Sequence, residues 1–254
     1  MRLLRKLALV LLAFAALTGI ALWTCPADIA YRWFATRLGP VTLTDLSGSI
    51  WHGHATSMRV FDHELGALDW NLSPWPLLKG DTVAQITIKG VDTTAQGTLT
   101  RHADRQLEIR DARIQMPASV LDPAVGVGDL TMRGRIEINL SQAHLRGAWI
   151  ESADGEALWL DAAVAGAAQA RLSDLKATFV TMSDGGIAGE LRDLGGPLAA
   201  DGMFSAGRGD YDAQLKLSAR DGDPHVLEAL THVGEPQSDG SVLLKIRGHL
   251  LKVF

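Results

Sequence analysis

Between positions 132 and 140 the chain reads Met132-Arg133-Gly134-Arg135-Ile136-Glu137-Ile138-Asn139-Leu140. Residues two apart share one face of a β-strand, so this stretch puts Met, Gly, Ile, Ile and Leu on one face and Arg, Arg, Glu and Asn on the other. Strands with one apolar and one polar face are typical of an antiparallel sheet that packs one side and exposes the other to water. The stretch therefore predicts an antiparallel β protein.

The same alternation recurs along the chain after residue 40, and turn signals rich in glycine, aspartate and proline separate the runs. We therefore predict a mostly β fold: an extended antiparallel meander, forming a curved sheet or a sandwich, with one or two short helices. The clearest helical spacing within it spans residues 224–232. The predicted strands are residues 41–46, 49–55, 65–72, 83–89, 107–114, 132–140, 172–181, 186–192, 198–206, 211–219 and 244–250.

The N-terminal segment has a different character. Residues 7–23 carry no charge, and fifteen of these seventeen residues are apolar. As a helix they would be about 26 Å long, close to the ~30 Å hydrocarbon core of a bilayer. We therefore predict a cytoplasmic basic tail at residues 1–6 and an N-terminal transmembrane helix, an uncleaved signal-anchor, at residues 7–24. The residues expected to hold this anchor in the membrane are Arg2, Arg5, Lys6, Leu7, Leu11, Phe14, Leu22 and Trp23.

A cleaved signal peptide and a lipidated Cys25 are the alternatives for this segment. Both require small residues before the processing site, whereas this chain has Leu22-Trp23-Thr24 there. The positive-inside bias places the basic N-terminus in the cytoplasm and everything after Trp23 on the other side of the membrane. Residues 25–40 are expected to form a juxtamembrane helix and linker, and residues 41–254 a β domain with a candidate lobe boundary near residues 117–129.

Charge and motif content exclude several classes of function. The whole chain carries a net charge of −5 and its first 24 residues +3, so the remainder carries −8, which argues against nucleic-acid binding. The single cysteine excludes a disulfide framework within the chain. No sequence motif of a common hydrolase, metalloprotease or nucleotide-binding enzyme occurs. We therefore expect no catalytic residues, no cofactor and no metal, and we interpret the protein as not being an enzyme.

Three local patterns need separate interpretations. His52 and His54 would share a strand face, but zinc requires a third protein ligand, so a solvated strand face is favoured over a metal site. Asp221-Gly222-Asp223 resembles part of a calcium loop but lacks its further ligands, so a plain turn is favoured. Trp51, Trp70 and Trp75 lie within 25 residues, and we interpret them as core packing, with a partner-binding surface as the alternative.

Four segments together resemble the type II secretion system protein N family: residues 46–55, 65–80, 194–198 and 239–248, following the cationic and apolar N-terminus. The resemblance implies a single-pass inner-membrane protein of a Gram-negative bacterium, with residues 41–254 as a periplasmic β domain, in the machine that exports folded proteins across the outer membrane. It implies inner-membrane platform proteins, and possibly the secretin, as partners, and it supplies no catalytic residues. The residues that carry the family pattern are Gly48, Trp51, Gly53, Leu68, Trp70, Pro74, Leu77, Leu78, Gly80, Gly196, Pro197, Gly240 and Gly248.

Two functions from different classes remain open on the sequence. A membrane-anchored β domain without an active site is suited to docking or assembly, because its edge strands can pair with partner strands. A curled sheet with an apolar concave face also resembles AsmA-like inner-membrane-anchored proteins, which implies lipid handling or envelope assembly. In that alternative the pairs Ile86/Ile88, Ile136/Ile138 and Leu215/Leu217 would line a groove for lipid.

Overall fold

The computed structural model describes residues 23–35, 39–60, 63–122, 129–147, 149–183, 185–207 and 210–249. The anchor residues Arg2, Arg5, Lys6, Leu7, Leu11, Phe14 and Leu22 lie outside these ranges, and Trp23 lies within them. Among the described helices, none has the length and apolarity needed to span a bilayer. The transmembrane helix at residues 7–24 therefore stays a prediction.

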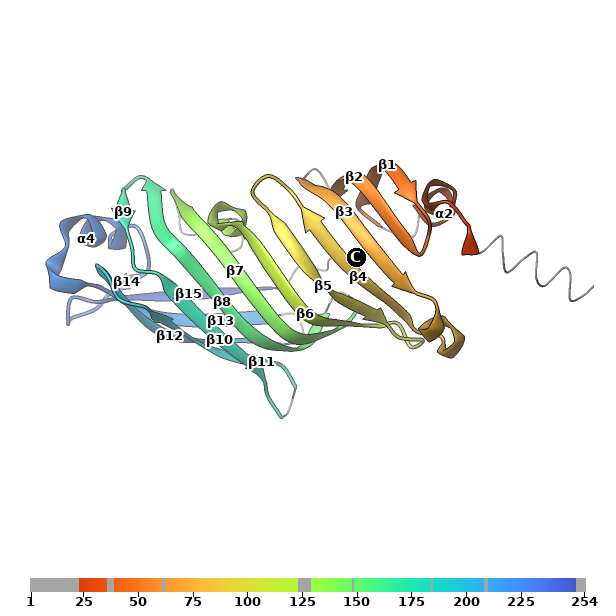
Figure 1. The fold of residues 1–254 in the computed structure, drawn as a ribbon. Coiled ribbons are helices and arrows are strands. Elements are labelled where there is room, and N and C mark those ends of the chain that lie inside the picture. Colours follow the sequence, from red (N-terminus) through yellow and green to blue (C-terminus); the bar gives the residue numbers. More distant parts are fainter. Residues whose placement is uncertain are drawn as a thin grey trace, which may run out of the picture.

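The described residues form one antiparallel sheet of fifteen strands (Figure 1). Each strand pairs with the next along the chain up to β8, and the order continues β10-β11-β12-β13-β15-β14, with β9 beside β8. The predicted antiparallel meander is confirmed, as one continuous sheet. The strands are β1 (Val41–Gly48), β2 (His52–Val60), β3 (His63–Ser73), β4 (Thr82–Lys89), β5 (Thr94–Arg101), β6 (Gln106–Pro117), β7 (Leu130–Arg146), β8 (Trp149–Gly166), β9 (Ala170–Arg171), β10 (Leu175–Thr181), β11 (Ile187–Asp193), β12 (Leu198–Gly207), β13 (Asp210–Ala219), β14 (Glu235–Pro236) and β15 (Val242–His249).

Short helices flank the sheet. The expected juxtamembrane helix is α2 (Ala27–Phe34), shorter than the predicted segment 25–40, whose residues 36–38 lie outside the description. The helix expected at 224–232 is α4 (Pro224–Leu230). Three 3-10 turns, η2 (Trp75–Lys79), η3 (Ala118–Leu121) and η4 (Arg220–Gly222), complete the described helical elements. Strand β6 pairs with β7 along eleven residue pairs, so the sheet continues past the possible lobe boundary at 117–129, which stays a prediction.

Strands β5 and β8 were not among the predicted strands, for different reasons. Strand β5 contains Leu99 as its single large apolar residue, so its alternation is faint. Strand β8 is 18 residues long, but its inward face changes phase. Trp159 and Val164 both line the interior although they are five positions apart, an odd spacing that places two residues on opposite faces of a regular strand. A β-bulge explains this change, because the register shifts around Gly134 and Asp161 adopts a φ of 52°.

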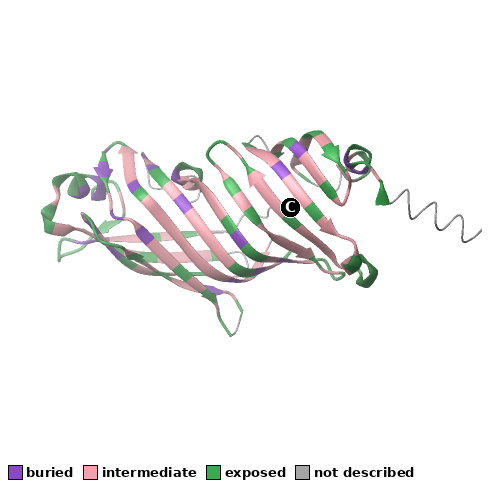
Figure 2. Ribbon diagram, viewed as in Figure 1, coloured by how far each residue is buried: buried purple, intermediate pink, exposed green. Residues whose placement is uncertain are grey.

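Bulges of this kind also bend the sheet. Gly134 has a φ of 96°, and a side chain there would overlap the backbone oxygens of Leu160 and Asp161, so glycine is required at this bend. Beyond it the sheet curls, and β12, β13 and β15 face β7 and β8 across the interior (Figure 1). The largest buried cluster gathers where α4 meets this curl, around Leu130, Leu198 and Val226, whereas most of the remaining sheet is half-buried (Figure 2).

Candidate functional site

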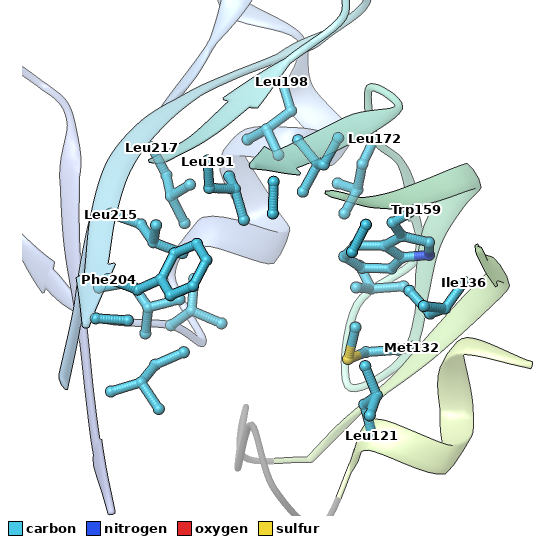
Figure 3. Close-up of a pocket in the computed structure, with 18 of the residues that line it drawn as sticks. Leu121, Met132, Ile136, Trp159, Leu172, Leu191, Leu198, Phe204, Leu215 and Leu217 are labelled. Carbon is cyan, nitrogen blue, oxygen red and sulfur yellow. The ribbon is translucent and has the colours of Figure 1, made fainter. Parts of the chain in front are cut away.

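The curled C-terminal half of the sheet encloses an apolar cavity of about 540 Å³. Protein interiors rarely contain voids larger than a water molecule, and ligand pockets typically measure about 300–1,000 Å³. The cavity is therefore far too large for a packing defect and has the size of a ligand site. Its walls carry aliphatic and aromatic side chains that point toward one another (Figure 3), including Met132, Ile136, Trp159, Phe204, Leu215 and Leu217.

Strand alternation places these side chains inside the curl. On β13, Leu215 and Leu217 line the cavity while the intervening Lys216 is exposed. Phe204 on β12 lies against Gly189 of β11, where a side chain would overlap its ring. The ring of Phe179 packs beside that of Phe204, with 6.5 Å between the two ring centroids. Large side chains such as Phe204 thus lie next to glycines such as Gly189, and the interior of the curl is open instead of being a filled core.

Two polar side chains at the cavity wall, Trp159 and Asp212, form hydrogen bonds with other parts of the protein. The indole N–H of Trp159 donates to the carbonyl oxygen of Arg133 at 2.7 Å. The carboxylate of Asp212 accepts a hydrogen bond from Nε of Arg247. No lining side chain among the described residues buries a polar atom without a partner. The wall also includes Ser205 and Tyr211, but it is almost entirely hydrocarbon, so the cavity offers a ligand chiefly apolar contact.

Helix α4 closes one end of the cavity. Asp223 caps this helix, because its Oδ1 accepts from the backbone N–H groups of His225 at 2.9 Å and Val226 at 3.1 Å, and Pro224 occupies the first turn. Val226 is fully buried, and Val226 and Leu230 both belong to the cavity wall. The turn expected at residues 221–223 is thus present, and it also positions the helix that closes the cavity.

A second notable cluster lies on the polar face of the sheet. Glu108 on β6 is only 5% exposed, and its carboxylate is hydrogen-bonded to Nε of Arg110, with His102 at 3.4 Å and His144 at 3.5 Å. Burial acts to raise the pKa of Glu108, but the hydrogen bonds from Arg110 and His102 and the neighbouring charges outweigh it and lower the pKa below its usual range. In the described part of the chain no group of three His, Cys, Asp or Glu side chains is arranged to hold a metal. The cluster is a structural ion-pair network.

His52 and His54 lie on strand β2, and their side chains differ in their surroundings. His54 is hydrogen-bonded through Nδ1 to Oδ1 of Asp69 at 2.7 Å, and this contact lowers the pKa of Asp69. His52 is exposed on the same strand. These two histidines belong to no potential metal site within the described residues.

Five residues of the family pattern come together at the β1–β3 end of the sheet. Gly48 ends β1 with a φ of 83°, and Trp51 follows in the connection to β2. Gly53 pairs with Trp70 across β2 and β3, and a side chain at Gly53 would overlap the indole ring. Trp70 donates from Nε1 to the carbonyl oxygen of Ile50 at 3.1 Å. The group thus fixes a tight strand connection; the residues are Gly48, Trp51, Gly53, Leu68 and Trp70.

The next part of the pattern forms the exposed turn η2. Pro74 precedes it, and Gly80 ends it with a φ of 86°. Trp75 is 76% exposed and Leu78 81% exposed. Core packing is therefore the wrong interpretation for Trp75, because the 3-10 helix η2 carries its side chain away from the sheet. The alternative of a partner-binding surface stays open for η2.

The C-terminal part of the pattern lies apart from these groups and shapes turns and close contacts. Gly196 has a φ of 124° and lies against Ser173, while the carbonyl oxygen of Pro197 accepts from the N–H of Arg220 at 2.7 Å. Gly240 turns the chain before β15, and Gly248 on β15 lies under the ring of Tyr211.

Sequence reasoning found part of the cavity. Ile136, Ile138, Leu215 and Leu217 line it as the groove hypothesis expects, whereas Ile86 and Ile88 lie on β4, outside it. The groove hypothesis was wrong for Ile86 and Ile88, because the sheet curls around a common space only from β7 onward. Trp159 and Phe204 were missed, because neither alternation nor spacing shows which distant strands face each other.

The two sheet edges differ in how they are covered. At β1, the backbone N–H of Leu43 donates to the hydroxyl of Tyr31 at 3.1 Å, so α2 caps the edge. At the other end, β14 has two residues and pairs only with Val242 and Leu243. Within the described residues, the outer edge of β15 from residue 244 to 249 pairs with no strand. An uncovered edge of this kind is a template for strand addition.

Comparisons with known proteins address the family. A family model described as type II secretion system (T2SS), protein N, matches residues 39–245. No similar protein was found among curated sequences, and no similar fold among solved structures. The family match runs from the residues just before β1 to Lys245 within β15, and so covers strands β1 to β14, the first residues of β15 and most of the cavity wall. The chain therefore belongs to the type II secretion system protein N family.

Proposed function

We propose that this protein is a non-enzymatic docking element of the type II secretion system, held in the inner membrane by residues 7–24 with its β domain in the periplasm. The observation that carries the proposal is the family match over residues 39–245. The basic, apolar N-terminus supports the anchor and its orientation. Inner-membrane platform proteins, and possibly the secretin, are the proposed partners.

A docking role fits the chemistry of the described residues. The tightest cluster of titratable groups, around Glu108, is an ion-pair network with its charges paired within the sheet. Hydrocarbon side chains make up most of the cavity wall, and the carboxylate of Asp212 there is hydrogen-bonded to Arg247. Neither feature supports covalent or acid–base catalysis, whereas a large sheet with an uncovered edge supports association.

The outer edge of β15 is the proposed docking surface. Strand addition at an edge takes its affinity from backbone hydrogen bonds and its specificity from alternate side chains. Tyr31 already occupies part of the β1 edge, while residues 244–249 of β15 pair with no described strand on their outer side. Lys245 and Arg247 are both exposed on this strand.

Site-specific cross-linking in the native host tests this proposal. A benzophenone-bearing amino acid replaces Lys245 in the full-length chain, and the same amino acid replaces Lys216 of β13 as a control, since both edges of β13 are paired. We expect a cross-link from position 245, and none from position 216, to a platform protein or the secretin. Cross-linking at both positions alike, or only to proteins outside the secretion system, would contradict docking at this edge.

Charge reversal provides a matched functional comparison. Arg247→Glu places a carboxylate beside Asp212, and Arg192→Glu places one beside Glu190 on the interior strand β11. Both changes create an exposed like-charge pair, but only the first lies at the free edge. We expect Arg247→Glu to reduce both the cross-link from position 245 and the export of secreted proteins, and Arg192→Glu to leave both intact. Equal effects of the two variants would refute the edge assignment.

The anchor is tested separately. We expect the full-length protein to stay in the membrane fraction after carbonate washing, because an apolar helix of about 26 Å is held by the bilayer core. A protease added from the periplasmic side should degrade the β domain. Release by carbonate, or protection of the domain from periplasmic protease, would contradict the proposed topology.

A further inference from the structure

We infer that the cavity within the curled sheet binds an acyl chain of a membrane phospholipid. The first support is its wall chemistry. Side chains from seven strands and α4 present hydrocarbon to a space of about 540 Å³, and Trp159 and Asp212 at the wall already have hydrogen-bond partners. A ligand group that needed a hydrogen bond would lose its water there without replacement. Transfer of a hydrocarbon chain from water into an apolar cavity lowers the free energy, and it breaks no hydrogen bond of the ligand.

The backbone of the cavity wall argues against a peptide occupant. The strands from β7 to β13 are hydrogen-bonded to a strand on each side, so their N–H and C=O groups lie in the plane of the sheet. An extended peptide inside the curl would bury its own N–H and C=O groups without partners, at a high cost per group. An acyl chain carries no such groups and can follow an irregular apolar space.

The shape of the sheet lets one end of a ligand remain outside. Helix α4 closes the cavity at Val226 and Leu230, while β15 pairs with no described strand across the curl. An amphiphile can therefore enter with its chain and keep its headgroup in water. The choice of a phospholipid as the source rests on the membrane anchor of the proposed function, which keeps this domain beside a bilayer.

Photolabelling tests the inference on the full-length protein reconstituted in vesicles. The probe is a phosphatidylethanolamine with a diazirine near the end of one acyl chain, and labelled residues are mapped by mass spectrometry. We expect label on cavity residues such as Met132, Phe204 and Leu215. Label confined to residues before β1, with none on the cavity wall, would overturn the inference. This readout is independent of any secretion partner, so it separates failure here from failure of the docking role.

A matched pair of variants on β10 tests the location. Ala177 lines the cavity, and its neighbour Thr178 is exposed on the opposite face. We expect Ala177→Phe to lower cavity labelling about tenfold, the change that corresponds to excluding roughly two methylene groups, while Thr178→Phe leaves labelling unchanged. Circular dichroism and thermal unfolding verify that both fold. Equal labelling of the two folded variants would refute the cavity as the site, and if Ala177→Phe does not fold, the wild-type map decides alone.

Two further arms identify the occupant. If diazirine-bearing palmitate labels the cavity and the phospholipid probe does not, the phospholipid assignment is wrong. A chain ending at His249 removes residues 250–254, which are four apolar residues and Lys252. If the cavity of the full-length protein resists labelling and the shortened chain accepts label, this segment of the protein itself is the occupant, and the inference is overturned.

Discussion

Replacing Gly53 with alanine is expected to destabilise the sheet through the indole ring of Trp70. Gly53 and Trp70 pair across β2 and β3, and the ring lies directly over the glycine, where a new methyl group would overlap it. The ring is rigid, so it must rotate away or the strands must separate. Either movement strains the hydrogen bond from Trp70 Nε1 to the Ile50 oxygen, which measures 3.1 Å.

The expected magnitude combines two effects. Overpacking a fitted site costs about 1–3 kcal/mol, and the loss of one hydrogen bond about 1 kcal/mol, so the free energy of unfolding should fall by about 2–4 kcal/mol. In a chain of this size that corresponds to a lowering of Tm by roughly 5–12 °C. Thermal unfolding of the full-length protein in detergent, followed by far-ultraviolet circular dichroism, measures it.

Two comparisons make this prediction sharp. Gly207→Ala adds the same methyl group at the end of β12, where the nearest atom, Cα of Gly186, lies 3.7 Å away, so its effect should stay within about 0.5 kcal/mol. In a Trp70→Ala background the cost of Gly53→Ala should largely disappear, because the overlapping ring is gone. An equal cost in both backgrounds, or equal effects of the Gly53 and Gly207 changes, would refute the reasoning.

Three further predictions concern other parts of the fold. Asp223→Ala should lower stability by about 1 kcal/mol through loss of the α4 cap and should speed hydrogen exchange in α4, measured by mass spectrometry; unchanged exchange would contradict the capping role. Tyr31→Phe should free the Leu43 N–H at the β1 edge and increase self-association, measured by light scattering against wild type. The lowered pKa of Glu108 means that its charged form stabilises the fold above about pH 4 and that this stabilisation is lost on acidification below it. Between about pH 6 and pH 3, the wild-type Tm should therefore fall more steeply than that of Glu108→Gln, and parallel profiles would contradict this.

The cavity and the outer edge of β15 suit binding partners of different chemistry. The edge of β15 presents backbone groups that suit another strand, while the cavity presents hydrocarbon that suits an acyl chain. The β15 edge and the cavity therefore differ in the chemistry that they offer a partner. Strand β15 belongs to both, because its outer edge from residue 244 to 249 pairs with no described strand and its residues Leu244 and Ile246 line the cavity.

Local sequence patterns were sufficient to predict much of the fold. Alternation over residues 132–140 and 211–219 predicted β7 and β13, because a strand in a one-sided sheet repeats every two residues. Pro224 and the apolar spacing after it predicted α4. Strand β8 was not predicted, because its bulge at Asp161 changes which residues face inward. A prediction from alternating residues assumes that the same alternation continues along the whole strand.

The sequence by itself determined the class of this protein: an acidic, antiparallel β domain behind an apolar N-terminus, without a recognisable catalytic motif. These properties are local, since each follows from the spacing and charge of neighbouring residues. Only the tertiary structure decided that β12 and β13 face β7 and β8, which places Phe204 opposite Trp159 around a cavity instead of in a filled core (Figure 3). The reason is physical: the curl of a sheet accumulates from twist and bulges over many strands, and no local stretch of sequence specifies which distant side chains it brings together.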